Sequence, residues 1–217
     1  MNSNKDRMGQ ILETALSVFA RYGFKKTTME DIAKELGMTQ SNLYFYVKNK
    51  KDLYELAVLE AITKWRKHMH KAFLGEKDLV RSIISMSEAG FDYILKNNDL
   101  RMIFVNDQDL LLRPYELIHK SETIARTAEA SRFGQKMLKQ SLKKGIEEKR
   151  FRNFNTDIIS VLLGQIYMTF IKQIFVLPEV ISRKEMTKEI VNLVLYGILN
   201  SDKKDKFNIA YEGYGKE

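Results

Sequence analysis

Residues 27–47 carry two short helical patterns separated by a very short turn, and this segment constrains the fold more than any other. Thr28 stands three residues before Asp31, the spacing of a capping box at the start of a helix. Gly37 ends that helix and Thr39 caps the next one, so the turn comprises only residues 37–39. Two short helices joined by a glycine-containing turn predict a helix-turn-helix over about residues 28–47.

A longer helical pattern precedes this motif. It begins near Lys5 and ends near Tyr22, and Gly23 follows as a glycine commonly does just past a helix end. Its apolar residues share one face: Ile11, Leu12, Ala15, Leu16 and Phe19. We therefore expect an amino-terminal three-helix domain over residues 1–50.

Helix geometry predicts which residues of the second motif helix face outward. With Leu43 at the buried centre and 100° per residue, Ser41 and Phe45 point directly away from it. Asn42 and Tyr44 lie on the shoulders. In a helix-turn-helix this helix enters the major groove of double-stranded DNA, and its first residues, including Gln40, meet base edges. Gln and Asn can bond to adenine, Ser can donate or accept, and an aromatic ring can pack on a thymine methyl.

Other residues in the segment allow a structural alternative. An aromatic residue in a short helix is usually core, although the position of Phe45 opposite Leu43 argues against that. Gln40 and Tyr46 lie nearer the buried side, where they can be peripheral packing residues. The lysines at positions 48, 50 and 51 can form a solvated turn, or they can neutralise phosphates at the end of the helix.

The segment GFKKTTMEDIAKELGMTQSNLYFYVKNKKDLY, residues 23–54, resembles the amino-terminal domain of the TetR family of bacterial regulators. The likeness covers about the first fifty-five residues and rests on many positions at fixed spacing: Gly23-Phe24, Thr28, Ile32-Ala33, Gly37, Leu43-Tyr44, Tyr46, and Lys50 before Leu53. Val47 departs from the phenylalanine of many members, on the buried side.

The resemblance implies a division of roles within the motif. It implies phosphate contacts from Thr28, Thr39, Tyr44, Tyr46 and Lys50. It implies base or mixed contacts from Gln40, Ser41, Asn42 and Phe45. It further implies a ligand-responsive transcriptional regulator, with repression as the family expectation, and a carboxyl-terminal helical domain for ligand binding and dimerisation.

The rest of the chain also has helical periodicity, and no alternation typical of strands rises above chance, so the predicted class is all-α. A larger domain is expected over residues 51–200, followed by a polar tail at 201–217. The expected helices cover residues 51–73, 79–95, 100–112, 114–149, 157–176 and 183–199.

Two of these helices predict a homodimer. The helix at 157–176 is apolar over most of its circumference and, with the helix at 183–199, resembles the pair that forms the family's dimer interface. A deep monomer core is the alternative. An apolar site for an unidentified small-molecule effector can be lined by Phe91, Met102, Phe104, Met137, Tyr167 and Met168, which can equally fill a core.

Composition limits the other function classes. The net charge of +8 favours a polyanionic partner, and the absence of cysteine removes disulfides and thiolate chemistry and fits a reducing cytoplasm. Polar residues interrupt the segment 158–177, so we expect no membrane span. We expect no export, because the amino terminus lacks an apolar signal core. We expect no cofactor and no metal site.

Two rival functions remain. An enzyme is the less favoured: His68 and His70 do not face each other on a helix, His119 stands apart, and residues 107–109 lack the rest of a calcium loop. An effector-independent architectural or constitutive DNA-binding protein is the main alternative, although residues beyond 50 are far more than dimerisation demands.

Overall fold

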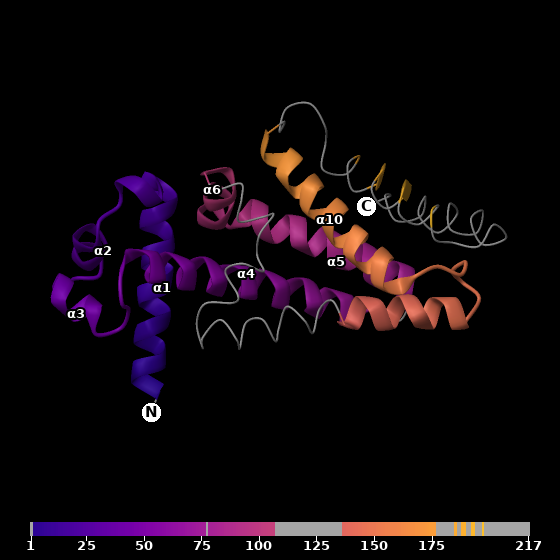
Figure 1. The fold of residues 1–217 in the computed structure, drawn as a ribbon, viewed down its shortest axis with the longest axis horizontal. Coiled ribbons are helices and arrows are strands. Elements are labelled where there is room, and N and C mark those ends of the chain that lie inside the picture. The colour runs from indigo at the N-terminus through magenta and orange to yellow at the C-terminus, as the bar shows by residue number, and fades with distance from the viewer. Residues whose placement is uncertain are drawn as a thin grey trace. The chain divides into compact units, whose positions relative to one another are not determined.

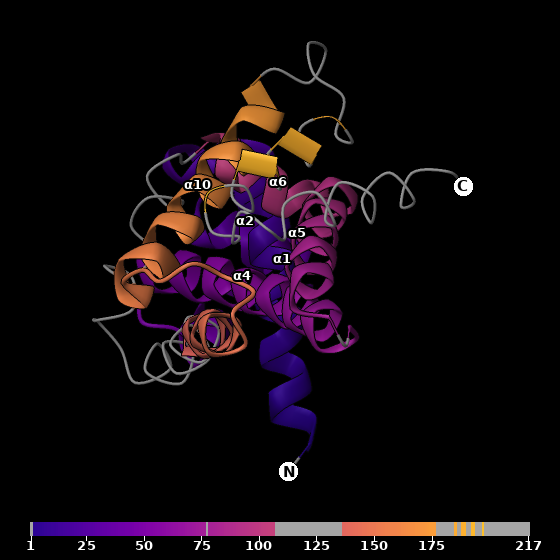
Figure 2. The same cartoon turned by 90° about the vertical axis from the view of Figure 1, so that its right-hand side faces the viewer.

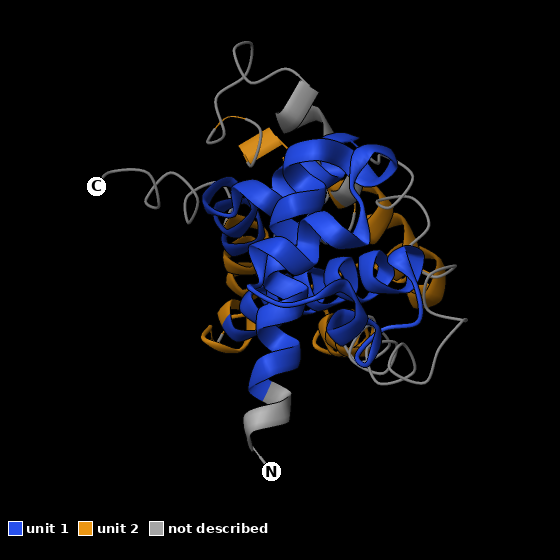
Figure 3. Ribbon diagram, turned by 90° about the vertical axis from the view of Figure 1, so that its left-hand side faces the viewer, with its two compact units in different colours: residues 1–71, 89–132 blue, residues 72–88, 133–217 orange. Residues whose placement is uncertain are grey.

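The computed structural model describes residues 2–76, 78–106 and 136–176, together with residues 185, 188, 189, 192, 193 and 197. Every regular element in these ranges is a helix, which confirms the predicted all-helical class. The chain divides into two compact units (Figure 3), residues 1–71 with 89–132 and residues 72–88 with 133–217. The domain boundary after residue 50 stays a prediction, and the tail at 201–217 lies outside the described residues.

The described helix bounds agree with the periodicity of the sequence to within a few residues, and residues 107–112 of the helix expected at 100–112 lie outside the described residues. The elements are α1 (Asn2–Lys26), α2 (Met29–Glu35), α3 (Gln40–Tyr44), α4 (Lys50–Leu74), α5 (Leu79–Lys96), α6 (Asn98–Asn106) and α10 (Thr156–Val176). Residues 136–147 form a further helix, the described part of the one expected at 114–149. Most of the helix expected at 183–199 lies outside the described residues.

Gly23 interrupts α1 instead of closing it. Its φ of 77° and ψ of 158° are not helical, and one more helical turn, residues 24–26, follows it. The expected end near Tyr22 is therefore a kink, because glycine has no Cβ to oppose a positive φ. The kink redirects the chain just before α2.

The first unit is built around the helix-turn-helix. α2 packs on both α1 and α3, and Figure 1 shows α1 crossing the first half of α4; Figure 2 shows the same elements from the side. The α1 face that enters the core is the expected one, with Ile11, Ala15 and Phe19 fully buried. Trp65 of α4 donates a hydrogen bond from Nε1 to the Gly90 carbonyl of α5 at 3.0 Å, which ties these two helices together.

The second unit has its own core. It consists of Val80 and Ile84 from α5, Leu142 from the 136–147 helix, and Phe151, with α10 residues packed against them. Phe151 lies directly on Gly145, where a Cβ would collide with its ring. Glycine at 145 is therefore what allows the chain to fold back onto its own helix.

Candidate nucleic-acid interface

The start of α2 is held by the capping box that the sequence predicts. The Thr28 hydroxyl accepts from the Asp31 amide at 3.1 Å and donates to Asp31 Oδ2 at 2.6 Å, while the Thr28 amide donates to the same oxygen at 2.8 Å. These bonds from Thr28 lower the pKa of Asp31 below its ordinary value. Thr28 is exposed, but its hydroxyl proton is already committed to Asp31.

The second motif helix, α3, is short and fixed from one side. Thr39 caps it, because its hydroxyl accepts from the Asn42 amide at 3.2 Å. Leu43 is completely buried and Val47 nearly so, which anchors the end of α3 and the residues that follow it to the core. The turn before α3 uses Gly37 at φ 64°, a conformation that glycine adopts without strain.

The opposite side of α3 is open, as helix geometry predicts. Phe45 is 84% exposed, and Ser41 and Asn42 are also exposed. We call Ser41, Asn42 and Phe45 the recognition face. The Phe45 ring is therefore available for contact with a partner.

The residues that flank the recognition face differ from one another. Tyr44 is 45% exposed, and its hydroxyl lies 3.5 Å from Gln40 Nε2, so these two polar side chains can interact across one helical turn. Tyr46 is half-buried, in agreement with its position nearer the core. The roles of all these residues in DNA contact stay predictions.

Lys50 has partners that sequence reasoning did not foresee. Its Nζ donates to the carbonyl oxygens of Phe24 and Thr27, both at 2.9 Å, and lies 4.6 Å from the centroid of the Phe24 ring. The side chain therefore joins the first residue of α4 to the connection between α1 and α2. The implied phosphate contact is a prediction that competes with these bonds.

Behind the motif, an aromatic cluster fixes α4 to α1. Tyr54 lies edge-on to Phe19 and tilted to Phe24, with centroids 5.0 Å away in each case. Such pairs contribute about 0.5–1.5 kcal/mol each beyond their burial. Arg21 and Glu35 add an exposed ion pair at 2.7 Å between α1 and α2.

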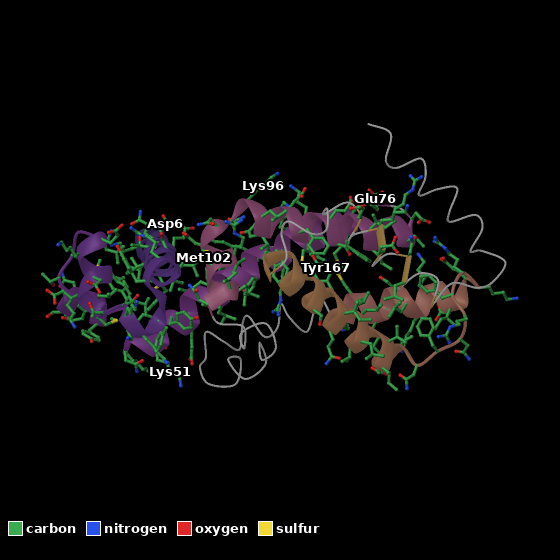
Figure 4. The ribbon with its side chains drawn as sticks, turned by 90° about the horizontal axis from the view of Figure 1, so that it is seen from above. Asp6, Lys51, Glu76, Lys96, Met102 and Tyr167 are labelled. Atoms are coloured by element: carbon green, nitrogen blue, oxygen red, sulfur yellow. The ribbon has the colours of Figure 1, made fainter. Side chains whose placement is uncertain are left out.

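Exposed lysines surround the motif. Lys25 and Lys26 lie three and two residues before the Thr28 cap of α2, and Lys48 and Lys51 flank the start of α4. Lys51, whose side chain is 65% exposed, projects from α4 (Figure 4). Sequence reasoning did not single out Lys25 and Lys26, although their position between the first helix and the Thr28 cap was a usable signal.

The six residues considered for an effector site are divided between the two units. Phe91 and Phe104 are buried in the first unit, where Phe104 packs on Trp65 with centroids 5.9 Å apart, and Met102 is half-buried there (Figure 4). Met137 and Tyr167 belong to the second unit. The side chain of Met168 lies outside the described residues.

Tyr167 is the polar member of that set. Its hydroxyl donates to the Ser87 carbonyl at 3.1 Å within the second unit (Figure 4). Burial raises the pKa of the Tyr167 phenol well above its ordinary value, so the hydroxyl stays a neutral donor.

Two other kinds of site are absent from the described ranges. There, no three His, Asp or Glu side chains gather closely enough to hold a metal ion. No helix in those ranges, α10 included, combines the length and hydropathy required to cross a bilayer. His119 and residues 107–109 lie outside the described residues.

Comparison with known proteins places the motif in a family. Residues 11–57 match the family model of bacterial regulatory proteins of the tetR family. The HTH-type transcriptional regulator YdgC of Bacillus subtilis (strain 168), itself described as uncharacterized, is 22% identical over 200 residues, which cover 88% of this chain and 91% of YdgC.

Two further proteins are similar over different lengths. IcaR of Staphylococcus aureus, a negative transcriptional regulator of the biofilm operon icaADBC, is 35% identical over 49 residues, which span 23% of this chain and 26% of IcaR. The crystal structure of AibR with isovaleryl coenzyme A and operator DNA matches the fold with a TM-score of 0.63 at 14% identity, over 86% of this chain and 97% of AibR. Residues 11–57 are thus similar to bacterial regulatory proteins of the tetR family, and most of the chain is similar in sequence to an HTH-type transcriptional regulator and in fold to AibR.

Proposed function

We propose that this chain is a homodimeric repressor that reads an operator through α3 and releases it when a small molecule binds the carboxyl-terminal part. The observation that carries the proposal is the recognition face: Ser41, Asn42 and Phe45 are exposed on a helix whose other side is fully buried at Leu43. A rigid helix with an open polar and aromatic face fits the major groove.

Base contacts are assigned to the recognition face together with Gln40. Asn42 and Gln40 carry amides that can bond bidentately to adenine, and Ser41 can donate or accept. Phe45 offers an apolar surface for a thymine methyl. Their exposure leaves these side chains free to adapt to base edges.

Phosphate contacts are assigned to Thr39, Tyr44 and Tyr46, which flank the same helix. Thr28 joins them if its hydroxyl proton turns from Asp31 to a phosphate oxygen. Lys25, Lys26 and Lys48 add positive charge around the motif, and counterion release makes such contacts dependent on salt.

In this proposal, the exposed side of α10 forms the interface with a second copy of the chain. Ile158, Val161 and Leu162 are 57%, 45% and 44% exposed and share one stripe at i, i+3 and i+4. Leu193, at 64% exposure, is the corresponding apolar residue on the segment expected at 183–199. A dimer places two recognition helices about one turn apart, ~34 Å, as a helix-turn-helix protein requires.

Effector control is assigned to the part of the chain beyond the motif. AibR, whose structure contains isovaleryl coenzyme A and operator DNA, illustrates a protein of this fold with both partners. In our proposal Met137 and Tyr167 of the second unit contribute to an apolar site for this effector. The effector must bind the DNA-incompetent state more tightly, since equal affinity for both states shifts nothing. No catalytic role is proposed.

Selection from a random duplex DNA library with the purified full chain tests DNA reading. We expect enrichment of a two-fold symmetric sequence, and the Ser41→Ala, Asn42→Ala double variant should lose it while staying folded, because both positions are exposed. Asn153→Ala, at another exposed asparagine, is the matched control and should select the same sequence. The absence of any enriched motif with wild-type protein would reject the proposal.

Sedimentation equilibrium tests the dimer separately. Leu162→Arg should shift the chain towards monomer, whereas Asn153→Arg, which adds the same charge at an exposed site outside α10, should not. A monomeric wild type, or a dimer that tolerates arginine at position 162, would remove α10 as the interface.

A further inference from the structure

The connection from α1 to α2 has backbone carbonyls that accept hydrogen bonds from outside the helices. The kink at Gly23 breaks the regular helical bonding, and Thr27 repairs part of it by donating to the Gly23 carbonyl from its amide at 3.3 Å and its hydroxyl at 2.9 Å. Thr27 is 1% exposed, so this connection is packed and not a free loop. The carbonyls of Phe24 and Thr27 require other donors.

Lys50 supplies those donors from the start of α4. Its Nζ binds the Phe24 and Thr27 carbonyls at 2.9 Å each, across 26 and 23 residues of sequence. The same ammonium lies 4.6 Å from the Phe24 ring, and one turn further along α4 Tyr54 packs on that ring. We infer that Lys50 is a positioning residue for DNA reading, which sets the direction of α2 and α3 by fixing the Gly23–Thr27 connection to α4.

The geometry leaves Lys50 little capacity for a phosphate. An ammonium has three N–H donors, and two of them are used by carbonyls while the group also lies over an aromatic ring. One N–H therefore remains for a phosphate, and any second bond to it requires a carbonyl bond to break, which leaves a part-buried carbonyl unsatisfied. Lys51, the next residue, has no such constraint, because its side chain is 65% exposed.

The effect on DNA reading is indirect. Thr27 directly precedes the Thr28 cap of α2, and α2 leads into α3 through the three-residue turn at 37–39. Displacement at Thr27 therefore moves the recognition face as a whole. Since base contacts demand a side-chain placement within about 0.5 Å, such a displacement reduces discrimination between sequences.

This inference rests on the proposed function, and the test separates it from two other roles for Lys50. A phosphate anchor contributes equally to all sequences and to the salt dependence. A residue that only stabilises the fold changes unfolding but not the affinity of folded protein. A positioning residue changes the ratio of operator to non-specific affinity without changing the salt dependence.

The experiment compares Lys50→Met, which keeps the apolar stem and removes the ammonium, with wild type and Lys50→Arg. Lys51→Met is the matched control for loss of one positive charge from the same helix turn. Each protein is titrated at 10 °C against the selected operator and a scrambled duplex over a range of salt concentrations, with the active fraction determined by stoichiometric titration. Hydrogen exchange at the amides of residues 27–32 is measured without DNA.

We expect Lys50→Met to lower the operator-to-scrambled affinity ratio by roughly tenfold, about the worth of one base-pair contact. The slope of log affinity against log salt should be unchanged, and exchange at 27–32 should accelerate. Lys50→Arg should restore most of the ratio, since a guanidinium retains donors for both carbonyls.

Other outcomes overturn the inference. If Lys50→Met reduces the slope of log affinity against log salt by about 0.9 and leaves the operator-to-scrambled affinity ratio unchanged, Lys50 is a phosphate anchor. If hydrogen exchange at residues 27–32 accelerates while the affinity ratio and the salt slope stay unchanged, the role of Lys50 is purely structural. Wild-type protein with no preference for any duplex rejects the proposed function, whereas unchanged exchange in Lys50→Met rejects the connection to α4 whether or not DNA is bound.

Discussion

Two turns in this molecule have the same hydrogen bonds but different residues at their centre. After α2, the Gly37 amide donates to the Lys34 carbonyl and the Met38 amide donates to the Ala33 carbonyl. After the 136–147 helix, the Lys149 amide donates to Ile146 and the Arg150 amide to Gly145, with the same sequence separations. Both turns follow the Schellman pattern.

The difference lies in the left-handed residue. Gly37 has φ 64° and Lys149 has φ 56°, but only glycine adopts this region without a penalty. The motif turn is thus encoded locally. The turn at Lys149 depends on its surroundings: Phe151 is buried on Gly145, and Arg150 pairs with Asp78 at the start of α5. A local turn holds α3, whereas a tertiary one closes the second core.

Removal of the Phe151 ring, which supports the tertiary turn at Lys149, should cause the largest loss of stability. Phe151 is 2% exposed and packs with Val80, Ile84 and Leu142. Phe151→Ala should lower the free energy of unfolding by about 3–5 kcal/mol, as measured by urea denaturation. Phe154→Ala, at a half-buried neighbour, should cost less. Equal losses in the two variants would mean that Phe151 does not anchor the tertiary turn.

Substitution in the recognition face should have the opposite pattern: it should change DNA sequence preference and leave the stability of the fold unchanged. Asn42→Ala should relax preference at one base pair by ~1–3 kcal/mol, because a bidentate base contact is lost. Its urea midpoint should stay within error of wild type, since Asn42 is exposed. Repeated DNA selection is the measurement, and an unchanged selected motif would remove Asn42 from the base-reading set.

The conformational cost at the motif turn can be isolated, because an added Cβ at Gly37 meets nothing within 4 Å. Gly37→Ala should therefore destabilise the chain by about 1 kcal/mol through its positive φ alone. Gly9→Ala also meets no neighbour but lies inside α1, where alanine should stabilise by roughly 0.5–1 kcal/mol. A change in melting temperature of the same sign in both variants would contradict the argument that the positive φ of Gly37 strains alanine.

Lys149→Gly makes the opposite change in the tertiary turn, because it places glycine at the left-handed position. Glycine removes the left-handed penalty, ~1–2 kcal/mol, but adds entropy to the unfolded chain. The net expectation is a stabilisation of about 0.5–1 kcal/mol in the urea midpoint. Lys144→Gly, within the 136–147 helix, should destabilise. If Lys149→Gly loses stability, interactions of the lysine side chain outweigh its backbone strain.

The same contrast explains how much could be predicted from the sequence. Local signals were sufficient for the Thr28 and Thr39 caps, for the outward position of Phe45, and for the bounds of α4, α5 and α10. Each of these depends on residues within about one or two helical turns, so spacing alone reveals it.

Features built from distant residues were missed. The bonds of Lys50 to the Phe24 and Thr27 carbonyls join residues more than twenty positions apart, and no periodicity encodes such a pairing. The helical residues 24–26 that follow the non-helical Gly23 were also missed, since a glycine just past a helix end gives no signal that another turn follows. The family resemblance likewise marked Lys50 as important but assigned it to DNA.

The smallest expected effect tests the ion pair that supports the tertiary turn. Burial opposes ionisation of Asp78, but hydrogen bonds from the Arg81 amide and the Arg150 guanidinium hold the pKa of Asp78 below its ordinary value. A depressed folded-state pKa stabilises the chain above the unfolded pKa of about 3.9, and this stability is lost as the pH falls through the folded value.

The expected size is at most about 1 kcal/mol, because the Asp78 side chain is 42% exposed and solvent screens the pair. Wild type should exceed Asp78→Asn in urea midpoint at pH 7, and the difference should shrink towards pH 3. Arg150→Met should reduce this pH dependence, since one of the groups that depress the pKa is removed. A difference between wild type and Asp78→Asn that stays constant from pH 7 to pH 3 would show that the Asp78 charge does not support the turn, and that the burial of Phe151 alone holds Lys149 in its left-handed conformation.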